Sequence, residues 1–190
     1  MGEIMRILAL VLLGASTFFV SGCGNFFSDP SEDFDQYGTP ANVSPGGRFK
    51  MDWVERGFSA RGLTRCQLSA SQNGLGVLEV GFQDGDSDSE MNLTLTGFNP
   101  QSNQHQIVGS GRTSGGSVVL KAGGDQRLNL FRNVSANGRG SSSQCQIKTR
   151  VQGTYIEAAF QCQNLYNEYG QPRNASGEVR CLTEQYTWDE

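Results

Sequence analysis

Alternation of apolar and polar residues constrains the fold of this 190-residue chain more than any other feature. From about Arg48 onward, short alternating runs are separated by clusters of Gly, Asn, Asp and Ser, at intervals of roughly ten residues. Each run places every second side chain on the same face of an extended strand. The pattern therefore predicts an all-β domain whose strands each bury one face.

The clearest alternating runs are Leu78 to Phe82 and Met91 to Leu95. Two more, Cys145 to Val151 and Ile156 to Cys162, lie on either side of Gly153 and predict a β-hairpin. Further strands are expected near five other segments: Arg48 to Trp53, His105 to Gly109, Ser117 to Lys121, Arg127 to Arg132 and Gly177 to Leu182.

Composition also favours strands over helices. The chain contains 25 glycines, and no segment has a convincing helical period. We therefore expect an antiparallel β-sandwich. A β-barrel is the alternative architecture.

The N-terminal segment indicates where such a domain would be located. The apolar run from Ile7 to Val20 is shorter than the 20 or so residues that span a bilayer, and it ends in Val20-Ser21-Gly22-Cys23. A short apolar run followed by small residues and a cysteine resembles the lipobox signal of bacterial lipoproteins. The resemblance implies that residues 1–22 are a signal peptide that is removed, and that Cys23 is acylated with fatty acids such as palmitate.

The rest of the N-terminal region divides accordingly. Glu3 is unusual in an export signal, whereas Met5 followed by Arg6 provides the expected basic start, so we expect translation to begin at Met5. Residues 23–47 are rich in Pro, Gly and acidic residues, which predicts a flexible tether before a β domain at 48–190. The lipid would anchor the chain to a membrane of the cell envelope. Because Gly24 replaces the aspartate of retained lipoproteins, the resemblance implies the outer membrane if the source has two.

The remaining cysteines predict two disulfides. Their number is even, as expected in an exported chain, and they are far apart in sequence instead of in the close pairs typical of zinc sites. If Val151 opposes Ile156 across the hairpin, Cys145 opposes Cys162, with Cβ atoms about 5 Å apart. We therefore expect Cys145 to pair with Cys162 and Cys66 with Cys181. Pairing of Cys66 with Cys145 and Cys162 with Cys181 remains the alternative.

The C-terminal region resembles a second group of proteins. Tyr155 to Phe160, a loop containing Asn167 and Pro172, and Glu178 to Cys181 are similar to the end of the mycobacterial lipoprotein antigen family. That family also has a lipobox, a mobile tether and a disulfide-closed β domain. The additional cysteines of this chain depart from the family's simpler pattern. The resemblance implies a surface antigen or a carrier of hydrophobic molecules.

One loop between predicted strands is a candidate metal site. It places carboxylates at alternate positions, and such oxygen ligands suit Ca²⁺: Asp84, Asp86, Asp88 and Glu90. The loop is not an EF-hand, because Ser89 replaces the required glycine and Leu95 replaces the final glutamate. The alternative is an acidic turn exposed to solvent.

Other classes of function find less support in the sequence. His105 is the single histidine and lies in a polar turn, and the chain contains no G-x-S-x-G motif, so we assign no catalytic residue. The net charge of −4 and the scattered basic residues disfavour nucleic-acid binding.

Together these features predict a lipid-anchored lipoprotein of the bacterial envelope. Its β domain would be structural or would bind a protein or small-molecule partner without catalysis. A calcium-dependent surface adhesin and a carrier of a hydrophobic ligand are the alternatives, and a hydrolase is the least favoured.

Overall fold

The computed structural model describes residues 44–70, 75–111, 114–136 and 140–183. The expected signal peptide, Cys23 and most of the expected tether lie outside these residues. The described strands are antiparallel and form one 11-stranded sheet. They are β1 (Gly46–Met51), β2 (Val54–Ser59), β3 (Leu63–Ala70), β4 (Gly76–Asp84), β5 (Ser89–Phe98), β6 (Gln104–Val108), β7 (Gly116–Ala122), β8 (Leu130–Arg132), β9 (Gln144–Gln152), β10 (Tyr155–Tyr166) and β11 (Pro172–Leu182).

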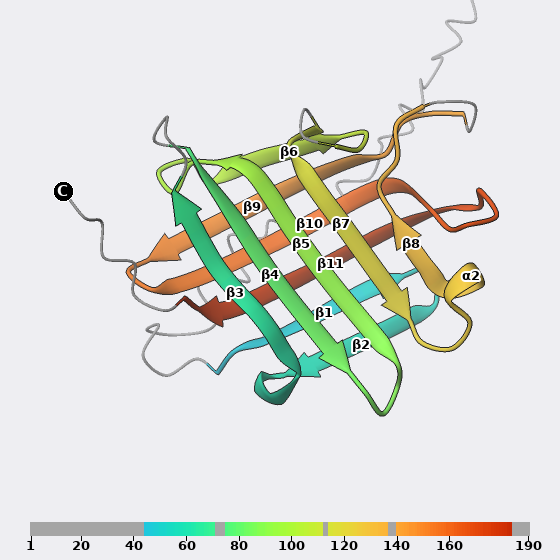
Figure 1. Ribbon diagram of the computed structural model, residues 1–190, viewed down its shortest axis with the longest axis horizontal. Helices are drawn as coiled ribbons and strands as arrows, with labels where there is room; N and C mark the ends of the chain where they lie inside the picture. The colour runs from blue at the N-terminus through green and yellow to red at the C-terminus, as the bar shows by residue number, and fades with distance from the viewer. Residues whose placement is uncertain (1–43, 71–74, 112–113, 137–139, 184–190) are drawn as a thin grey trace, which may run out of the picture.

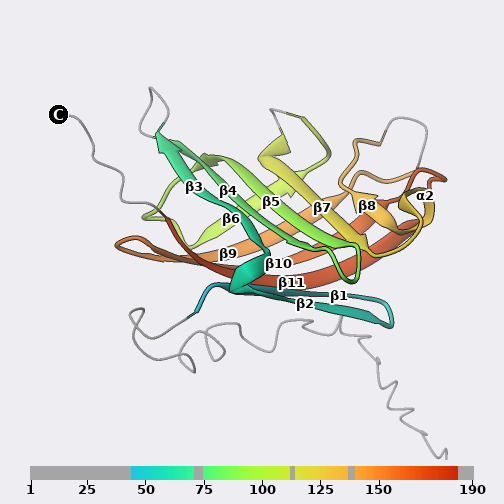
Figure 2. The ribbon, with the colours of Figure 1, turned by 60° about the horizontal axis from the view of Figure 1, so that its bottom comes forward.

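The sheet folds over into two layers (Figures 1 and 2). The front layer in Figure 1 contains β3, β4, β5, β7 and β8, paired in the order β3-β4-β5-β7-β8. The back layer contains β6, β9, β10, β11, β1 and β2, paired in that order. Each layer therefore has one face toward the other layer and one outer face.

Strand β10 connects the two layers along one side. It pairs with β9 from Tyr155 to Gln163, and then with β8 through Tyr166 opposite Arg132. A bulge at Asn164, which has a φ of 57°, separates the two pairings. The layers are therefore continuous, and the sheet is nearly closed and barrel-like. The predicted antiparallel all-β fold is confirmed.

The core lies between the layers and is built from the apolar positions of the alternating runs. The predicted inward residues of β4 and β5 are at most 2% exposed: Leu78, Val80, Phe82, Met91, Leu93 and Leu95. From the back layer, Ile147, Ile156, Ala158 and Phe160 face them and are also buried. The period-2 pattern thus identified the buried face of these strands correctly.

The expected strand at Arg127 to Arg132 is wrong in its first half. Residues Gln126–Asn129 form a short helix, α2, and only Leu130–Arg132 form a strand. The Asp125 carboxylate accepts a hydrogen bond from the Arg127 backbone N–H, so Asp125 caps the first turn of the helix. Strand β11 also begins earlier than expected, at Pro172, and β1 begins at Gly46, just before the expected start of the domain.

The predicted hairpin and its register are confirmed. Val151 pairs with Ile156, and Cys145 therefore pairs with Cys162. Both disulfides of the first-choice pairing are present, Cys145 with Cys162 and Cys66 with Cys181.

Candidate functional site

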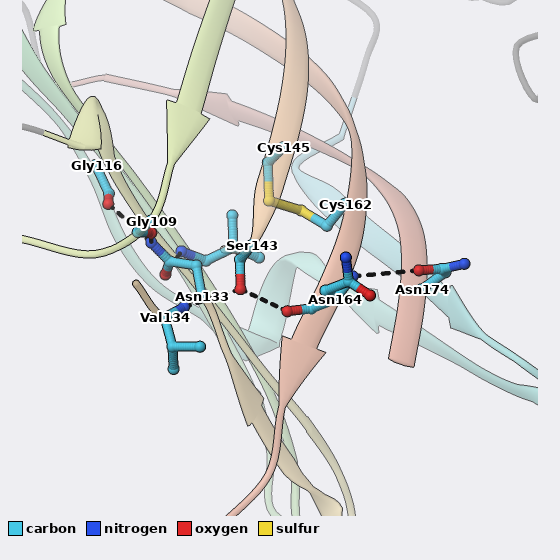
Figure 3. Close-up of a disulfide and its surroundings, with 10 residues drawn as sticks. Gly109, Gly116, Asn133, Val134, Ser143, Cys145, Cys162, Asn164 and Asn174 are labelled. Carbon is cyan, nitrogen blue, oxygen red and sulfur yellow. Dashed lines mark hydrogen bonds between the residues drawn. A yellow bond between two sulfur atoms is a disulfide. The ribbon is translucent and has the colours of Figure 1, made fainter. Parts of the chain in front are cut away.

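The Cys145–Cys162 disulfide lies next to a buried polar network (Figure 3). Asn133, which follows β8, donates from Nδ2 to the carbonyl oxygens of Gly109 at 2.6 Å and Gly116 at 3.2 Å. Its Oδ1 accepts from the backbone N–H of Val118 at 2.9 Å. One amide side chain therefore bonds to three backbone groups, one at Gly109 after β6 and two in β7.

Ser143 extends the network to the back layer (Figure 3). Its hydroxyl donates to the carbonyl oxygen of Asn164 at 2.5 Å and accepts from the backbone N–H of Val134 at 2.9 Å. The backbone N–H of Asn164 in turn donates to Oδ1 of Asn174 at 3.2 Å. These bonds hold the bulge of β10 in place, which indicates a structural role for the network.

The second disulfide joins the two layers. Cys66 belongs to β3, at the edge of the front layer, and Cys181 belongs to β11 of the back layer. The layers are already continuous on one side, where β8 pairs with β10. The disulfide adds a covalent link between the layers at a different place, from β3 to β11. It accounts for the remaining pair of thiols in the β domain.

The structure does not bring the four candidate calcium ligands together. Asp84 caps its own turn: its carboxylate accepts from the Ser87 hydroxyl at 2.5 Å and from the Asp86 backbone N–H at 3.2 Å. The hydrogen bond from the Ser87 hydroxyl is the main reason that the pKa of Asp84 lies below its usual value. These are the bonds of an acidic turn and need no cation.

Two of the other three carboxylates, those of Asp88 and Glu90, have different partners. Asp88 forms an ion pair with the buried amine of Lys121 at 2.6 Å, and Glu90 accepts a hydrogen bond from the side-chain amide of Asn92. In the described part of the chain, no three His, Cys, Asp or Glu side chains are grouped so that they could hold a metal ion.

His105 is half-buried at the start of β6 and is held by its neighbours. Its Nε2 lies 3.1 Å from both the Ser102 carbonyl oxygen and the Thr149 hydroxyl. Its ring stacks obliquely on Phe98, with centroids 4.9 Å apart. Burial lowers the pKa of His105. These contacts fix the imidazole between β6 and β9 and give it a structural role.

A buried charge cluster lies on the outer face of the back layer. Glu157 is 1% exposed and lies opposite Arg150 of β9 and Arg180 of β11 in the strand register. Its carboxylate is 3.4 Å from Nε of Arg150 and accepts a hydrogen bond of 2.6 Å from the Tyr155 hydroxyl. Burial, followed by the hydrogen bond to Glu157, raises the pKa of Tyr155 far above its usual value.

Six glutamines occupy neighbouring positions on the same outer face, and we call this surface the amide face. Gln106 of β6 pairs with Gln146 of β9, which pairs with Gln161 of β10. Five of the six are exposed and Gln161 is half-buried. The amide face comprises Gln104, Gln106, Gln144, Gln146, Gln161 and Gln163.

Two adjacent hollows open on the amide face. One, of about 350 Å³, is lined by Gln104, Gln106, Gln146 and Lys148. The other, of about 320 Å³, has six polar residues in its lining: Lys50, Asp52, Gln161, Gln163, Asn174 and Ser176. Because Gln146 and Gln161 are direct neighbours across β9 and β10, the two hollows adjoin along one line across the strands.

An exposed aromatic residue follows Asp52, one of the residues that line the second hollow. Asp52, in the turn between β1 and β2, pairs with Arg173 at 2.8 Å. The next residue, Trp53, is 90% exposed. An exposed aromatic residue thus directly follows, along the chain, a residue that lines the hollow.

A third hollow, of about 280 Å³, lies on the outer face of the front layer around Gly81. Its polar groups bond to one another. Arg65 pairs with Glu79 at 3.2 Å, and Asn92 donates to Glu90. By contrast, no hydrogen bond among the described residues uses a side-chain amide of the amide face. The amide face is therefore the better candidate for ligand binding.

Comparisons with known proteins do not extend this assignment. No protein-family model, curated protein or solved structure matches the chain. Among residues 44–70, 75–111, 114–136 and 140–183, no helix has the length and apolar character needed to cross a membrane.

The sequence contained part of the signal for the amide face. Gln144 and Gln146, and likewise Gln161 and Gln163, alternate with buried residues and so lie on the outer side of their strands. Their assembly with Gln104 and Gln106 depends on the pairing of β6 with β9. Periodicity within a strand does not reveal which distant strand lies beside it.

Proposed function

We propose that this chain is a lipid-anchored lipoprotein of the bacterial cell envelope whose β domain acts by binding and not by catalysis. The observation that carries the proposal is the pairing of Cys66, Cys145, Cys162 and Cys181 in two disulfides. Disulfides persist in the oxidising compartments outside the cytosol. The remaining cysteine, Cys23, directly follows a short apolar run and small residues, as a lipidated cysteine requires.

The location follows from the same signal. The anchor would hold the domain at a membrane of the envelope, and the acidic tether at 23–47 would separate the domain from the lipid surface. Gly24, which directly follows Cys23, favours the outer membrane if the source bacterium has two membranes. This part of the proposal depends on the N-terminal residues and not on the β domain.

The role in binding follows from the surface of the domain. A continuous apolar cluster that includes Leu78, Met91 and Phe160 lies between the layers, and this packing disfavours a carrier of hydrophobic ligands. The glutamine side chains that line the two adjoining hollows of the amide face instead offer amide donors and acceptors to solvent. A polar ligand is therefore the better candidate.

Metabolic labelling with an alkyne fatty acid tests the anchor in a bacterial host. The full chain should incorporate the label, and mass spectrometry of the mature protein should find acylated Cys23 at its N-terminus. Cys23→Ser should abolish the labelling. Ser21→Ala is the matched control, since it keeps a small residue within the signal and should be labelled normally. Equal labelling of Cys23→Ser, or a mature chain that retains residues 1–22, would refute the proposal.

A further inference from the structure

The free side chains of the amide face point to the class of ligand. A carboxamide carries N–H donors and a C=O acceptor in one plane, so it can form paired hydrogen bonds with two neighbouring hydroxyl groups. Five of the six glutamines are exposed, and none of their amides bonds within the described part of the chain. Exposed amides do not require partners, but a cluster of them offers many donors and acceptors to a ligand rich in hydroxyl groups.

The charges around the amide face disfavour an ionic ligand. Asp52 is paired with Arg173, and Arg48 is paired with Glu178 at 3.0 Å. Each hollow has one lysine in its lining, Lys50 of β1 and Lys148 of β9, but β11 and β10 lie between these strands, so the two cations are not clustered. Recognition of a polyanion needs clustered cations that are available to phosphate or sulfate groups. The centre of the face, at Gln146 and Gln161, is uncharged, and this favours an uncharged polar ligand.

The shape of the surface favours an extended ligand. The two hollows lie along a row of paired residues: Gln106, Gln146, Gln161, Ser176 and Lys50. This row crosses β6, β9, β10, β11 and β1, which are neighbouring strands of the back layer in Figure 1. With about 4.8 Å between strands, the row is roughly 19 Å long. A chain of several linked rings would fit along it, whereas a single small molecule would fill only one hollow.

Trp53 lies in the turn after β1, the last strand that the row crosses. Its ring is 90% exposed beside Asp52, which lines the second hollow. An exposed indole provides a flat apolar platform with a polar N–H. The apolar face of a sugar ring could stack on such a platform while the hydroxyl groups of the sugar reach the amides.

We propose that the amide face binds an uncharged oligosaccharide strand, which lies across β6, β9, β10, β11 and β1 with one end against Trp53. This inference rests on the proposal that the β domain is a binding module, but it does not depend on the lipid anchor. Two sources share the required chemistry: the N-acetylated glycan of a cell wall, and a simple glucan.

Calorimetric titration of the full chain, purified in detergent, tests the proposal. The probes are chitotetraose for the N-acetylated source and cellotetraose for the glucan. Binding of either probe supports the site, and the tighter one identifies the source. Gln146→Ala combined with Gln161→Ala should weaken binding roughly tenfold, since each variant removes about one hydrogen-bonding group. Trp53→Ala should weaken it by a similar factor.

Gln67→Ala is the matched control, because Gln67 is an exposed glutamine on β3 of the front layer. It should bind as tightly as the unaltered chain. Circular dichroism of each variant checks that the fold is retained, as expected for surface positions. If neither probe binds at millimolar concentration, or if the glutamine and Trp53 variants bind normally, the inference is overturned. Acylation of Cys23 is tested by the labelling experiment described above, and its outcome does not depend on whether a sugar binds.

Discussion

At the scale of single residues, Glu157 shows how much one position depends on its neighbours. Its carboxylate is 1% exposed although it lies on the outer face of the back layer. A buried carboxylate is costly unless charges and hydrogen bonds compensate for the lost water. Arg150 and the hydroxyl of Tyr155 provide that compensation. Removal of either group should therefore lower the free energy of unfolding.

We expect Tyr155→Phe to lower the free energy of unfolding by about 1–3 kcal/mol, because the variant removes a hydrogen bond to a buried charged group. Urea denaturation followed by circular dichroism measures the change. Tyr169→Phe is the matched control, since Tyr169 is 59% exposed, and it should change stability by less than about 0.5 kcal/mol. Equal stability of the two variants would show that the Tyr155 hydroxyl contributes nothing.

His105 provides a second residue-scale prediction. Burial disfavours the charged imidazolium, so the pKa of His105 should lie below its usual value of 6.5. Below pH 6.5 the unfolded chain binds the proton more readily, and the stability from the neutral imidazole is lost as the pH falls through the lowered pKa. Because the chain has a single histidine, one imidazole signal in an NMR titration measures the pKa directly. A value of 6.5 or higher would contradict the prediction.

At the scale of strands, the close contact between β10 and β11 depends on a missing side chain. Gly177 pairs with Phe160, whose ring lies over the glycine. A Cβ at position 177 would be 2.5 Å from Cζ of Phe160 and 2.5 Å from the Arg48 carbonyl oxygen. The phenyl ring can move only into a packed core, and the carbonyl belongs to the neighbouring strand β1.

Gly177→Ala should therefore destabilise the domain by about 1–3 kcal/mol, as overpacking does in other cores. Thermal unfolding measures the loss. Gly57→Ala in β2 is the matched control, because a Cβ there meets no atom within 4 Å. The control should be neutral or slightly stabilising, since alanine restricts the unfolded chain. If Gly177→Ala unfolds at the same temperature as the control, the proposed crowding is absent.

Strands differ in how far the sequence predicts them. The hairpin of β9 and β10 was predictable with its register, because a short turn around Gly153 leaves few ways to align two alternating strands. The residues before β8 were not, because the cap at Asp125 outweighs a weak strand pattern. In the candidate calcium loop, the Asp84 carboxylate bonds to nearby backbone and side-chain donors, and alternation of acidic residues in the sequence does not reveal such local partners. The amide face required long-range pairing that no local pattern encodes.

At the scale of the whole molecule, two kinds of bond join the layers: backbone pairing and a disulfide. Strands β8 and β10 make the sheet continuous on one side through backbone pairing. Elsewhere, the Cys66–Cys181 disulfide links the edge strand β3 to β11. The Cys145–Cys162 disulfide, in contrast, lies within a hairpin whose strands are already paired from end to end. The two bonds should therefore differ in their contribution to stability.

Removal of the long-range disulfide should cost more than removal of the local one. The bonded cysteines are 115 residues apart in Cys66–Cys181 and 17 apart in Cys145–Cys162. On the chain-entropy model, closure of the longer loop stabilises the fold by about 5 kcal/mol and closure of the shorter loop by about 3 kcal/mol. Urea denaturation of the double variants Cys66→Ala with Cys181→Ala, and Cys145→Ala with Cys162→Ala, measures the difference. Each pair serves as the control for the other, since both replace two sulfurs with the same side chain. If the hairpin pair proved to be the costlier loss, the link between the layers would not be the main covalent constraint on the fold.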